Sequence, residues 1–188
     1  MNKIATNLQD CFILEPARFG DERGYYSPVY IAPELAELVF QGIAQISRSK
    51  SSRGILRGMH FQKGDYAQAK IVEVLQGAVI DVVIDLRPDS SSYRKFTSVY
   101  LDAEDNRQLY IPRGFAHGFL SLEDDTIFQY FVDNAYAPDQ EDGIAWDDPE
   151  IGINWQEIFS EYGIEEPTLS EKDQHRHTIT EYEQEQSK

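Results

Sequence analysis

The stretch AKIVEVLQGAVIDVVIDL, Ala69 to Leu86, decides the fold class because it consists of two short apolar runs separated by one turn signal. In the first run, Ala69–Leu75, successive side chains point to opposite faces, and Lys70 shares its face with valines. Both faces are mostly apolar, so we expect this strand to be covered on both sides. Gln76-Gly77 then provides a turn into the second run, Ala78–Leu86. The stretch therefore predicts two consecutive strands inside a β-rich domain.

Short strand candidates of the same kind recur on either side of this stretch. They lie at Cys11–Leu14, Tyr25–Tyr30, Ile43–Ser47, Phe96–Leu101, Gln108–Ile111, Phe115–Leu122 and Thr126–Asp133. Helical spacing of apolar residues occurs at Pro33–Phe40 and Trp155–Tyr162. Many short strands with few helices are typical of a sandwich or barrel. A jelly-roll barrel of this size places its ligand in the mouth or lumen of the roll.

The chain of 188 residues is expected to form a single domain, because no internal repeat or linker divides it. Residues 1–9 are polar and are expected to form an N-terminal arm. The stretch Ala135–Asp148 is expected to be a long loop. Residues 174–188 are polar and charged, and we expect them to fray as a C-terminal tail.

The charge and composition exclude several classes of partner. A formal net charge of −16 argues against nucleic acid, because phosphate backbones require a basic surface. An anionic small molecule is still possible, since a few focused arginines can hold it. The chain has no apolar run of about eighteen residues, so we expect no membrane span and no membrane partner. The absence of an apolar signal segment and the lone Cys11, expected in the core, favour the reducing cytoplasm.

The segment Gly54–Lys70 brings together residues that can carry out proton chemistry. It contains Arg57, His60 and Lys70, and the apolar residues between them indicate a packed segment instead of a solvated loop. A histidine that titrates near neutral pH beside two cations suits a site that removes a proton from a carbon acid and holds the resulting oxyanion. The alternative is that Arg57 and His60 form a satisfied pair without a function.

The other histidines bear on whether the site holds a metal. His117 lies between apolar residues after a Pro/Gly turn and is expected to be inside, whereas His175 and His177 lie in the polar tail and are expected to be exposed. A metal site of the double-stranded β-helix kind would offer a second histidine two residues after the first, and His60 has none. We therefore expect no metal. Two buried histidines then favour acid–base chemistry or hydrogen bonding to a substrate.

Two further residues have both a functional and a structural interpretation. Tyr130 lies on a strand with aromatic neighbours, so it complements the histidines as an acid or is a plain core aromatic with a bonded hydroxyl. For a single tyrosine the residues alone favour the core interpretation. Asp81 is either a partner for the cations of the site or a solvated strand carboxylate.

Beyond single residues, a series of motifs follows in a fixed order along the chain. It comprises Arg23-Gly24, RGILRGMHFQ at 53–62, QAK at 68–70, DVVIDLR at 81–87, RQLYIPRGFAHGF at 107–119, YAP at 136–138, GIAWDDP at 143–149, GINW at 152–155 and LSEKD at 169–173. This series resembles the dTDP-4-dehydrorhamnose 3,5-epimerase family over roughly residues 10–173. No single motif is decisive, but their order is highly specific.

The resemblance implies a mainly β fold of the double-stranded β-helix kind, jelly-roll and cupin-like, with a few short helices. It implies a homodimer with exchange at the N-terminal arm and no metal or organic cofactor. The implied reaction is epimerisation at C3 and C5 of a nucleotide sugar, dTDP-4-dehydro-6-deoxy-D-glucose, through enolate intermediates on the route to dTDP-rhamnose. Because the C4 ketone acidifies the hydrogens at C3 and C5, this chemistry requires a base and an acid on opposite faces of the sugar.

The resemblance also implies roles for individual residues. His60 matches the base, Asp173 the residue that orients its imidazole, and Tyr130 the acid on the opposite face. Lys70 matches the residue that stabilises the enolate oxygen. The implied substrate-binding residues, of which the two arginines hold the nucleotide and its diphosphate, are Arg23, Gln45, Ser47, Arg57, His117, Tyr136, Glu141 and Lys172.

The chain departs from the family pattern at Pro28, Ser47 and Phe131, where the family usually carries Glu, Asn and Lys. These departures leave open an epimerase that acts on C3 or C5 alone, or on another nucleotide-activated 4-keto-deoxysugar. An alternative of another class is a non-catalytic or metal-dependent cupin binding protein. A 3,4-ketoisomerase would need a different acid–base arrangement from the pair His60 and Tyr130.

Overall fold

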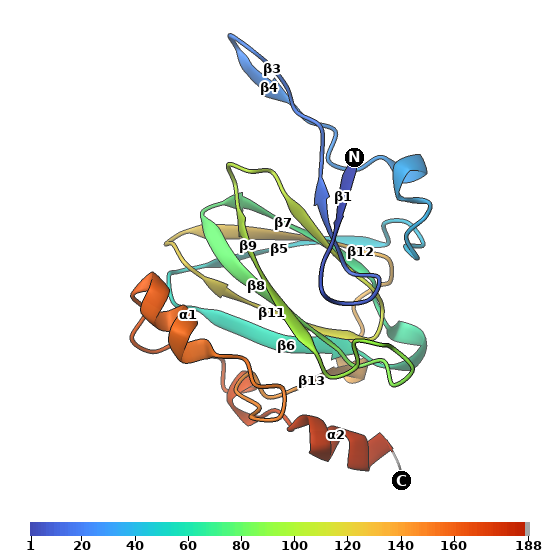
Figure 1. Ribbon diagram of the computed structural model, residues 1–188, viewed down its shortest axis with the longest axis vertical. Helices are drawn as coiled ribbons and strands as arrows, with labels where there is room; N and C mark the ends of the chain where they lie inside the picture. The colour runs from blue at the N-terminus through green and yellow to red at the C-terminus, as the bar shows by residue number, and fades with distance from the viewer. Residues whose placement is uncertain (187–188) are drawn as a thin grey trace.

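The computed structural model describes residues 1–186 as two antiparallel β-sheets packed face to face (Figure 1). The first sheet has the order β1 (Asn2–Ala5), β2 (Phe12–Glu15), β10 (Gln108–Ile111), β7 (Lys70–Gln76), β12 (Thr126–Val132) and β5 (Gln45–Ser51). The second has the order β13 (Glu141–Gly143), β6 (Leu56–Gln62), β11 (Phe115–Ser121), β8 (Ala78–Asp85) and β9 (Phe96–Asp102). The expectation of a mainly β fold is confirmed.

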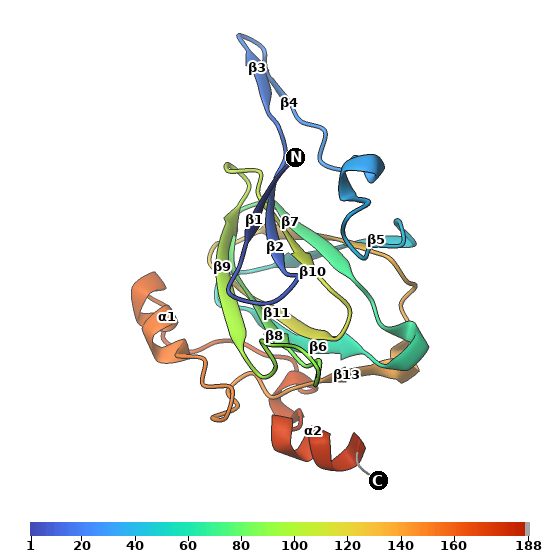
Figure 2. The same cartoon turned by 45° about the vertical axis from the view of Figure 1, so that its right-hand side comes forward.

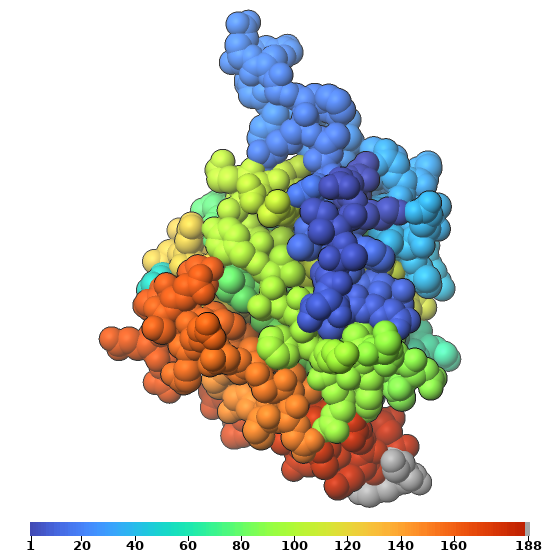
Figure 3. Space-filling view, viewed as in Figure 1, coloured from blue at the N-terminus to red at the C-terminus, as the bar shows by residue number. Residues whose placement is uncertain are grey.

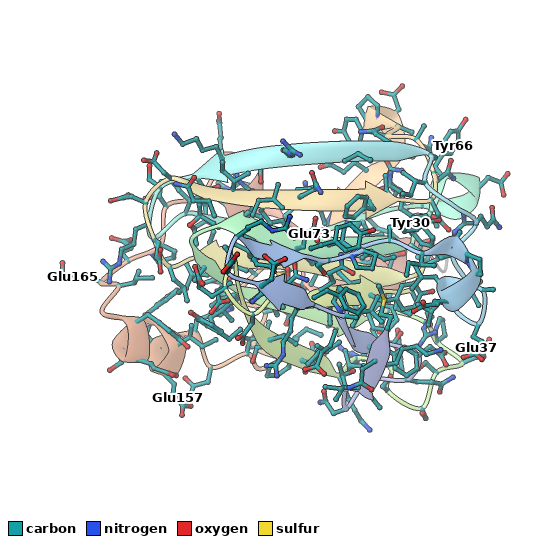
Figure 4. The ribbon with its side chains drawn as sticks, turned by 90° about the horizontal axis from the view of Figure 1, so that it is seen from above. Tyr30, Glu37, Tyr66, Glu73, Glu157 and Glu165 are labelled. Carbon is teal, nitrogen blue, oxygen red and sulfur yellow. The ribbon has the colours of Figure 1, made fainter. Side chains whose placement is uncertain are left out.

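The stretch Ala69–Leu86 connects the two sheets. Its strands β7 and β8 follow each other directly in the chain but belong to opposite sheets. The chain crosses over at Gly77, which has a φ of +78° and whose missing side chain leaves room for Thr126. β7 is buried on both faces from Ile71 to Val74, as predicted, because Val72 faces the interior while Glu73 lies on the outer face, but Leu75 near its end is 40% exposed. Glu73, labelled in Figure 4, accepts hydrogen bonds there from Gln108 (2.7 Å) and Gln129 (2.8 Å).

The apolar core has an inner layer between the sheets and outer layers that cover them. Val72, Val83, Phe119 and Phe128 pack between the sheets together with Cys11, which is buried as predicted. The outer face of the second sheet is covered by the C-terminal part of the chain, including α1 (Trp155–Tyr162) and α2 (Ile179–Gln186) (Figure 2). None of the helices within residues 1–186 is long and apolar enough to cross a membrane.

The N-terminal part of the chain differs from the sequence-based expectation. Residues 2–5 are not a free arm but strand β1, which pairs with β2 through the register Asn2↔Glu15. The helix expected at Pro33–Phe40 is a single 3₁₀ turn, η1 (Ala32–Leu35). One turn is sufficient to bury Leu35 and Leu38 in the apolar cluster on the outer face of the first sheet.

The strand expected at Tyr25–Tyr30 ends earlier, as β4 (Gly24–Tyr26), and it pairs with β3 (Phe19–Asp21). Pro28 lies beyond its end, where the missing N–H breaks no ladder. The β3–β4 hairpin projects away from the body of the molecule (Figures 1 and 3). Phe19 and Tyr26 are about two-thirds exposed on it, at 61% and 67%.

The C-terminal part of the chain is more ordered than expected. The predicted loop Ala135–Asp148 contains the 3₁₀ turn η3 (Pro138–Gln140) and strand β13, which pairs with β6. Residues 174–186 do not fray, because they include the end of the 3₁₀ turn η4 (Asp173–His175) and all of α2. The remaining two residues of the predicted tail lie outside the described part of the chain.

Contacts from distant strands and loops hold this C-terminal segment in place. The Asp148 carboxylate accepts a hydrogen bond from the Ile179 amide (2.5 Å), and the His177 carbonyl accepts one from the Ala145 amide (2.7 Å). The His177 side chain, expected to be exposed, is 38% exposed and lies 3.4 Å from Asp142. His175 is exposed as expected, whereas His177 is partly covered because the acidic edge at Asp142 provides it with a partner.

Strands β6 and β11 approach each other unusually closely where a β-bulge interrupts their pairing. A Cβ atom on Gly118 would lie 2.5 Å from the Arg57 carbonyl oxygen and 2.9 Å from the Gly58 Cα. Gly58 itself has a φ of +142°, which only glycine adopts without strain. Glycine at both positions therefore fixes the spacing of the two strands.

We predict that Gly118→Ala lowers the free energy of unfolding by about 2–4 kcal/mol, because the added methyl group meets backbone atoms that cannot move independently. Urea unfolding followed by circular dichroism measures this change. Gly20→Ala is the control, since its Cβ would meet only one atom, at an ordinary 3.6 Å. Equal stability of the two variants would contradict the steric argument.

Candidate active site

Two adjoining cavities lie between the sheets at the end where β6 and β12 face each other. The cavities have volumes of about 300 Å³ and about 470 Å³. Both are lined by His60, Tyr130 and Glu141. His60 comes from β6 in the second sheet and Tyr130 from β12 in the first, so the two side chains enter the shared space from opposite walls.

His60 is held by a buried carboxylate. Its Nε2 atom lies 2.5 Å from Oδ1 of Asp173, which η4 presents to the end of β6. Burial raises the pKa of Asp173, but the hydrogen bond and charge interaction with His60, with smaller contributions from Ser170 and Arg176, outweigh this effect and hold the pKa below its ordinary value. Asp173 therefore stays ionised and fixes the imidazole, which leaves Nδ1 as the ring nitrogen that can take up a proton.

His117 forms a second histidine–carboxylate pair behind the first. It lies opposite His60 in the β6–β11 register, and its Nε2 atom is 2.9 Å from Oδ2 of Asp81. Both side chains are almost completely buried, so Asp81 is a partner of the site and not a solvated strand carboxylate. Burial lowers the pKa of His117 despite Asp81, which favours the neutral imidazole. The centroid of its ring lies 6.1 Å from the centroid of the Tyr130 ring. His117 therefore supports the cavity wall from behind.

Lys70 brings a cation to the cavity from β7. Among residues 1–186 no salt bridge to its ammonium group is found, although Asp81 and Glu141 lie near enough to act on it through space. Burial lowers the pKa of Lys70 to about 8, against the opposing effect of these two carboxylates. The side chain is therefore still mostly charged at pH 7, and it is free to bind a negative charge that develops in the cavity.

The Tyr130 hydroxyl is nearly free of competing contacts. It lies 3.5 Å from the Ser49 hydroxyl, at the limit of a hydrogen bond. Burial raises the pKa of Tyr130 to about 12, so the phenol keeps its proton throughout the neutral range. The hydroxyl is therefore a proton donor facing the cavity and not merely a core group bonded elsewhere.

Glu141 organises the rim of the cavity. It accepts hydrogen bonds from the Tyr136 hydroxyl (2.6 Å), from Lys172 (2.5 Å) and from Arg176 (2.8 Å). Burial raises the pKa of Glu141, but these bonds outweigh it and hold the value at about 2. The predicted residues Tyr136, Glu141 and Lys172 thus meet in one ionic cluster beside His60.

The remaining predicted binding residues are divided between the cavity and a distant hairpin. Gln45 donates to the Ser47 hydroxyl (2.7 Å), and both residues line the smaller cavity. Arg57 lines the larger cavity and donates to the Ser51 hydroxyl (3.1 Å). Arg23 is not brought to the site, because it lies on the projecting β3–β4 hairpin, exposed and paired with Asp21.

The comparisons with known proteins agree with this geometry. The model of the dTDP-4-dehydrorhamnose 3,5-epimerase family matches residues 5–181. The chain belongs to this family. The dTDP-4-dehydrorhamnose 3,5-epimerase of Escherichia coli K12 is 42% identical over 183 residues, which cover 96% of each chain. The resemblance inferred from the ordered motifs is therefore confirmed, and the epimerase family places the chain among the isomerases.

Solved structures of the epimerase family show the same fold. The crystal structure of dTDP-4-dehydrorhamnose 3,5-epimerase from Elizabethkingia anophelis NUHP1 matches with a TM-score of 0.89 and 40% identity, covering 96% of this chain and 97% of that one. The enzyme from Legionella pneumophila Philadelphia 1, in complex with dTDP-4-keto-L-rhamnose, matches with a TM-score of 0.86 and 35% identity, covering 95% and 93%. The predicted cupin-like jelly-roll is therefore confirmed.

Sequence reasoning missed Arg176 at this epimerase-family site. The residue lies in the tail that was expected to be solvated, yet its side chain is only 8% exposed and it bonds Glu141. No local pattern distinguishes it from a surface arginine. The cavity-lining residues Ser49, Gln62 and Gln68 were missed as well, because their position depends on strand pairing over long distances.

We predict that Lys70→Met stabilises the fold, because it removes the cost of burying a charge. The pKa of Lys70 falls from 10.5 in the unfolded chain to about 8 in the folded one, so this cost is present in full below pH 8 and disappears as the pH rises towards 10.5. Urea unfolding should show a gain of about 1–3 kcal/mol at pH 7 and a smaller gain at pH 10.

Lys50→Met is the matched control for this substitution. Lys50 is exposed and pairs with the exposed Asp125, so its loss should change stability little at either pH. A Lys70→Met variant that is less stable than the wild type at pH 7 would show that the ammonium group is held by favourable contacts after all.

Proposed function

We propose that the protein epimerises C3 and C5 of dTDP-4-dehydro-6-deoxy-D-glucose to give dTDP-4-dehydro-L-rhamnose, on the route to dTDP-rhamnose. The observation that carries this proposal is the entry of His60 and Tyr130 into one cavity from opposite sheets, with Lys70 on the wall beside them. The Legionella relative, crystallised with dTDP-4-keto-L-rhamnose, supports a substrate of this chemical class.

The two proton-transfer groups suit inversion at a carbon next to a ketone. His60 takes the proton from the carbon through Nδ1 while Asp173 holds Nε2, and the electron pair of the broken C–H bond moves to the C4 oxygen as an enolate. Tyr130 then returns a proton to the opposite face of the same carbon. His60 has gained a proton and Tyr130 has lost one, so both exchange with solvent before the second carbon reacts.

Lys70 stabilises the charge that forms between these two steps. The enolate oxygen is an anion, and a cation already in place beside it requires no reorganisation. The pKa of about 8 means that this stabilisation is available at neutral pH and declines as the pH rises through that value. The reaction consumes no oxidant or reductant, and side chains supply the base, the acid and the electrostatic stabilisation, so we propose that it needs no metal or organic cofactor.

The substrate extends over both cavities, with its sugar in one and its nucleotide diphosphate in the other. We assign the sugar to the smaller cavity, near Gln45, Ser47 and Tyr136, and the nucleotide diphosphate to the larger one. Arg57 provides a forked cation for the phosphates in the larger cavity. Glu141 and Lys172 close the rim between them.

We also propose that the protein is a homodimer that works in the cytoplasm. The β3–β4 hairpin exposes large aromatic side chains and carries Arg23 away from its own cavity. A second copy would cover the aromatic residues, and Arg23 of the partner subunit would then provide a further cation for the nucleotide.

We predict that His60→Asn and Tyr130→Phe each lower kcat by about 10²–10⁴-fold, the usual contribution of general acid–base catalysis. Conversion of the nucleotide sugar is measured by NMR after reduction of the product. Tyr100→Phe is the control, because Tyr100 is 43% exposed on β9 and should leave kcat unchanged.

The same assay decides between the proposal and its alternatives. Unchanged turnover in both variants would show that the assigned roles are wrong. Tight substrate binding without turnover by the wild type would point to a binding protein, and activity lost to a chelator and restored by a divalent metal would point to a metal-dependent cupin. Inversion at one carbon alone would identify a mono-epimerase.

Complementation tests the origin of the nucleotide-binding arginine. Arg23→Ala and His60→Asn should each be nearly inactive alone. If Arg23 acts across the dimer, a co-expressed hybrid contains one complete site, with His60 from one subunit and Arg23 from the other, and should recover about half of the wild-type activity. A hybrid without activity would show that Arg23 serves its own chain, and full activity of Arg23→Ala alone would show that Arg23 serves neither site.

A further inference from the structure

We propose that Arg176 is a positioning residue that holds the Asp173 and Glu141 carboxylates on either side of His60, offsets their charge and so fixes the orientation of the imidazole. The inference rests on the proposed function in one respect, the role of His60 as the base. Its geometric basis is independent of the substrate.

The Arg176 guanidinium occupies a closely fitted position between the two carboxylates. Its Nη2 atom donates to Glu141 Oε1 (2.8 Å), and its Nε atom lies 3.8 Å from Asp173 Oδ1, the oxygen that also contacts His60. Gly143 on β13 leaves the space for it, because a Cβ there would lie 2.9 Å from Arg176 Nε. The Nε atom has no hydrogen-bond partner within the described residues, so this end of the side chain is held by charge and shape, while Nη2 keeps its bond to Glu141.

Several charged or titratable groups surround His60. They are Asp173 and Arg176 from the C-terminal segment, Glu141 from β13 with its partners Lys172 and Tyr136, Arg57 from β6, Lys70 from β7, Tyr130 from β12, and His117 from β11 with its partner Asp81. Among the cations next to Asp173 and Glu141, Lys172 is 57% exposed while Arg176 is 8% exposed. The charge of Arg176 is therefore much less screened by solvent.

The consequence for the base follows from the sign of these charges. Two carboxylates beside His60 favour the imidazolium, which already holds a proton and cannot accept one from a carbon. The buried Arg176 offsets them, and it is also one of several contacts that lower the pKa values of Asp173 and Glu141 and help to keep both carboxylates ionised. Because Arg176 offsets the negative charge, Asp173 can orient the imidazole without favouring its protonated form.

The test is an NMR titration of His60 in ¹⁵N-histidine-labelled full-length protein without substrate, with the His60 signal assigned by its absence in His60→Asn. Arg176→Gln should raise the pKa of His60 by about one unit, the size expected for one buried charge at this range. Arg176→Lys, which keeps the charge, should leave it near the wild-type value. The acid limb of the pH profile of kcat/KM should move upward with the pKa in Arg176→Gln.

Arg94→Gln separates the charge effect from docking of the C-terminal segment. Arg94 anchors this segment through Glu150 and lies 3.6 Å from Glu183 on α2, outside the site. It should leave the His60 pKa unchanged. An unchanged pKa in Arg176→Gln, or an equal rise in Arg94→Gln, would overturn the proposal and reduce Arg176 to a structural contact.

Two further features keep the test decisive. If Arg176→Gln does not fold, Glu141→Gln provides the opposite change: it leaves Arg176 uncompensated and should lower the His60 pKa, and an unchanged value would again overturn the proposal. Because the titration uses no substrate, its result stands even if the protein fails to convert the dTDP sugar, a failure that would count against the proposed function alone.

Discussion

The close contact between β6 and β11 is the constraint on which the geometry of the site depends. With glycine at positions 58 and 118 the two backbones approach within the space of one methyl group, and the bulge beside them sets His117 opposite His60. His117 then packs behind Tyr130 from the facing sheet. The spacing of two strands in one sheet thereby determines how His60 faces Tyr130 across the cavity.

The interior of this jelly-roll accommodates its ionisable groups mainly by pairing them. Asp173 and Asp81 each hold a histidine, while Glu141 collects two cations and a tyrosine hydroxyl. Lys70 and the Tyr130 hydroxyl stand apart, because the structure gives them no strong partner within the described residues. Both are groups that we propose to act on the substrate, and their lack of a strong bond carries a cost in stability that paired groups such as His60 do not carry.

The sequence was sufficient to predict secondary structure where the local residue pattern agrees with the fold. Alternation and turn residues predicted β10, and helical spacing predicted α1, each with its observed bounds, and the ordered motifs identified the family. The sequence was not sufficient to predict structure or burial where the contacting residues come from distant parts of the chain. The apolar spacing after Pro33 is satisfied by a single turn against a sheet, and Arg176 is buried because Glu141 and Asp173 happen to converge on it. No short-range signal encodes either outcome.

The central claim is that proton removal and proton return occur from opposite walls of one cavity. The most direct test is to incubate Tyr130→Phe with the nucleotide sugar in D₂O and to follow C3 and C5 by NMR. If His60 is the base and Tyr130 the opposing acid, deuterium enters with retention of configuration, because His60 can return a deuteron only to the face from which it removed the proton. Inversion at the wild-type rate in this variant would contradict the account.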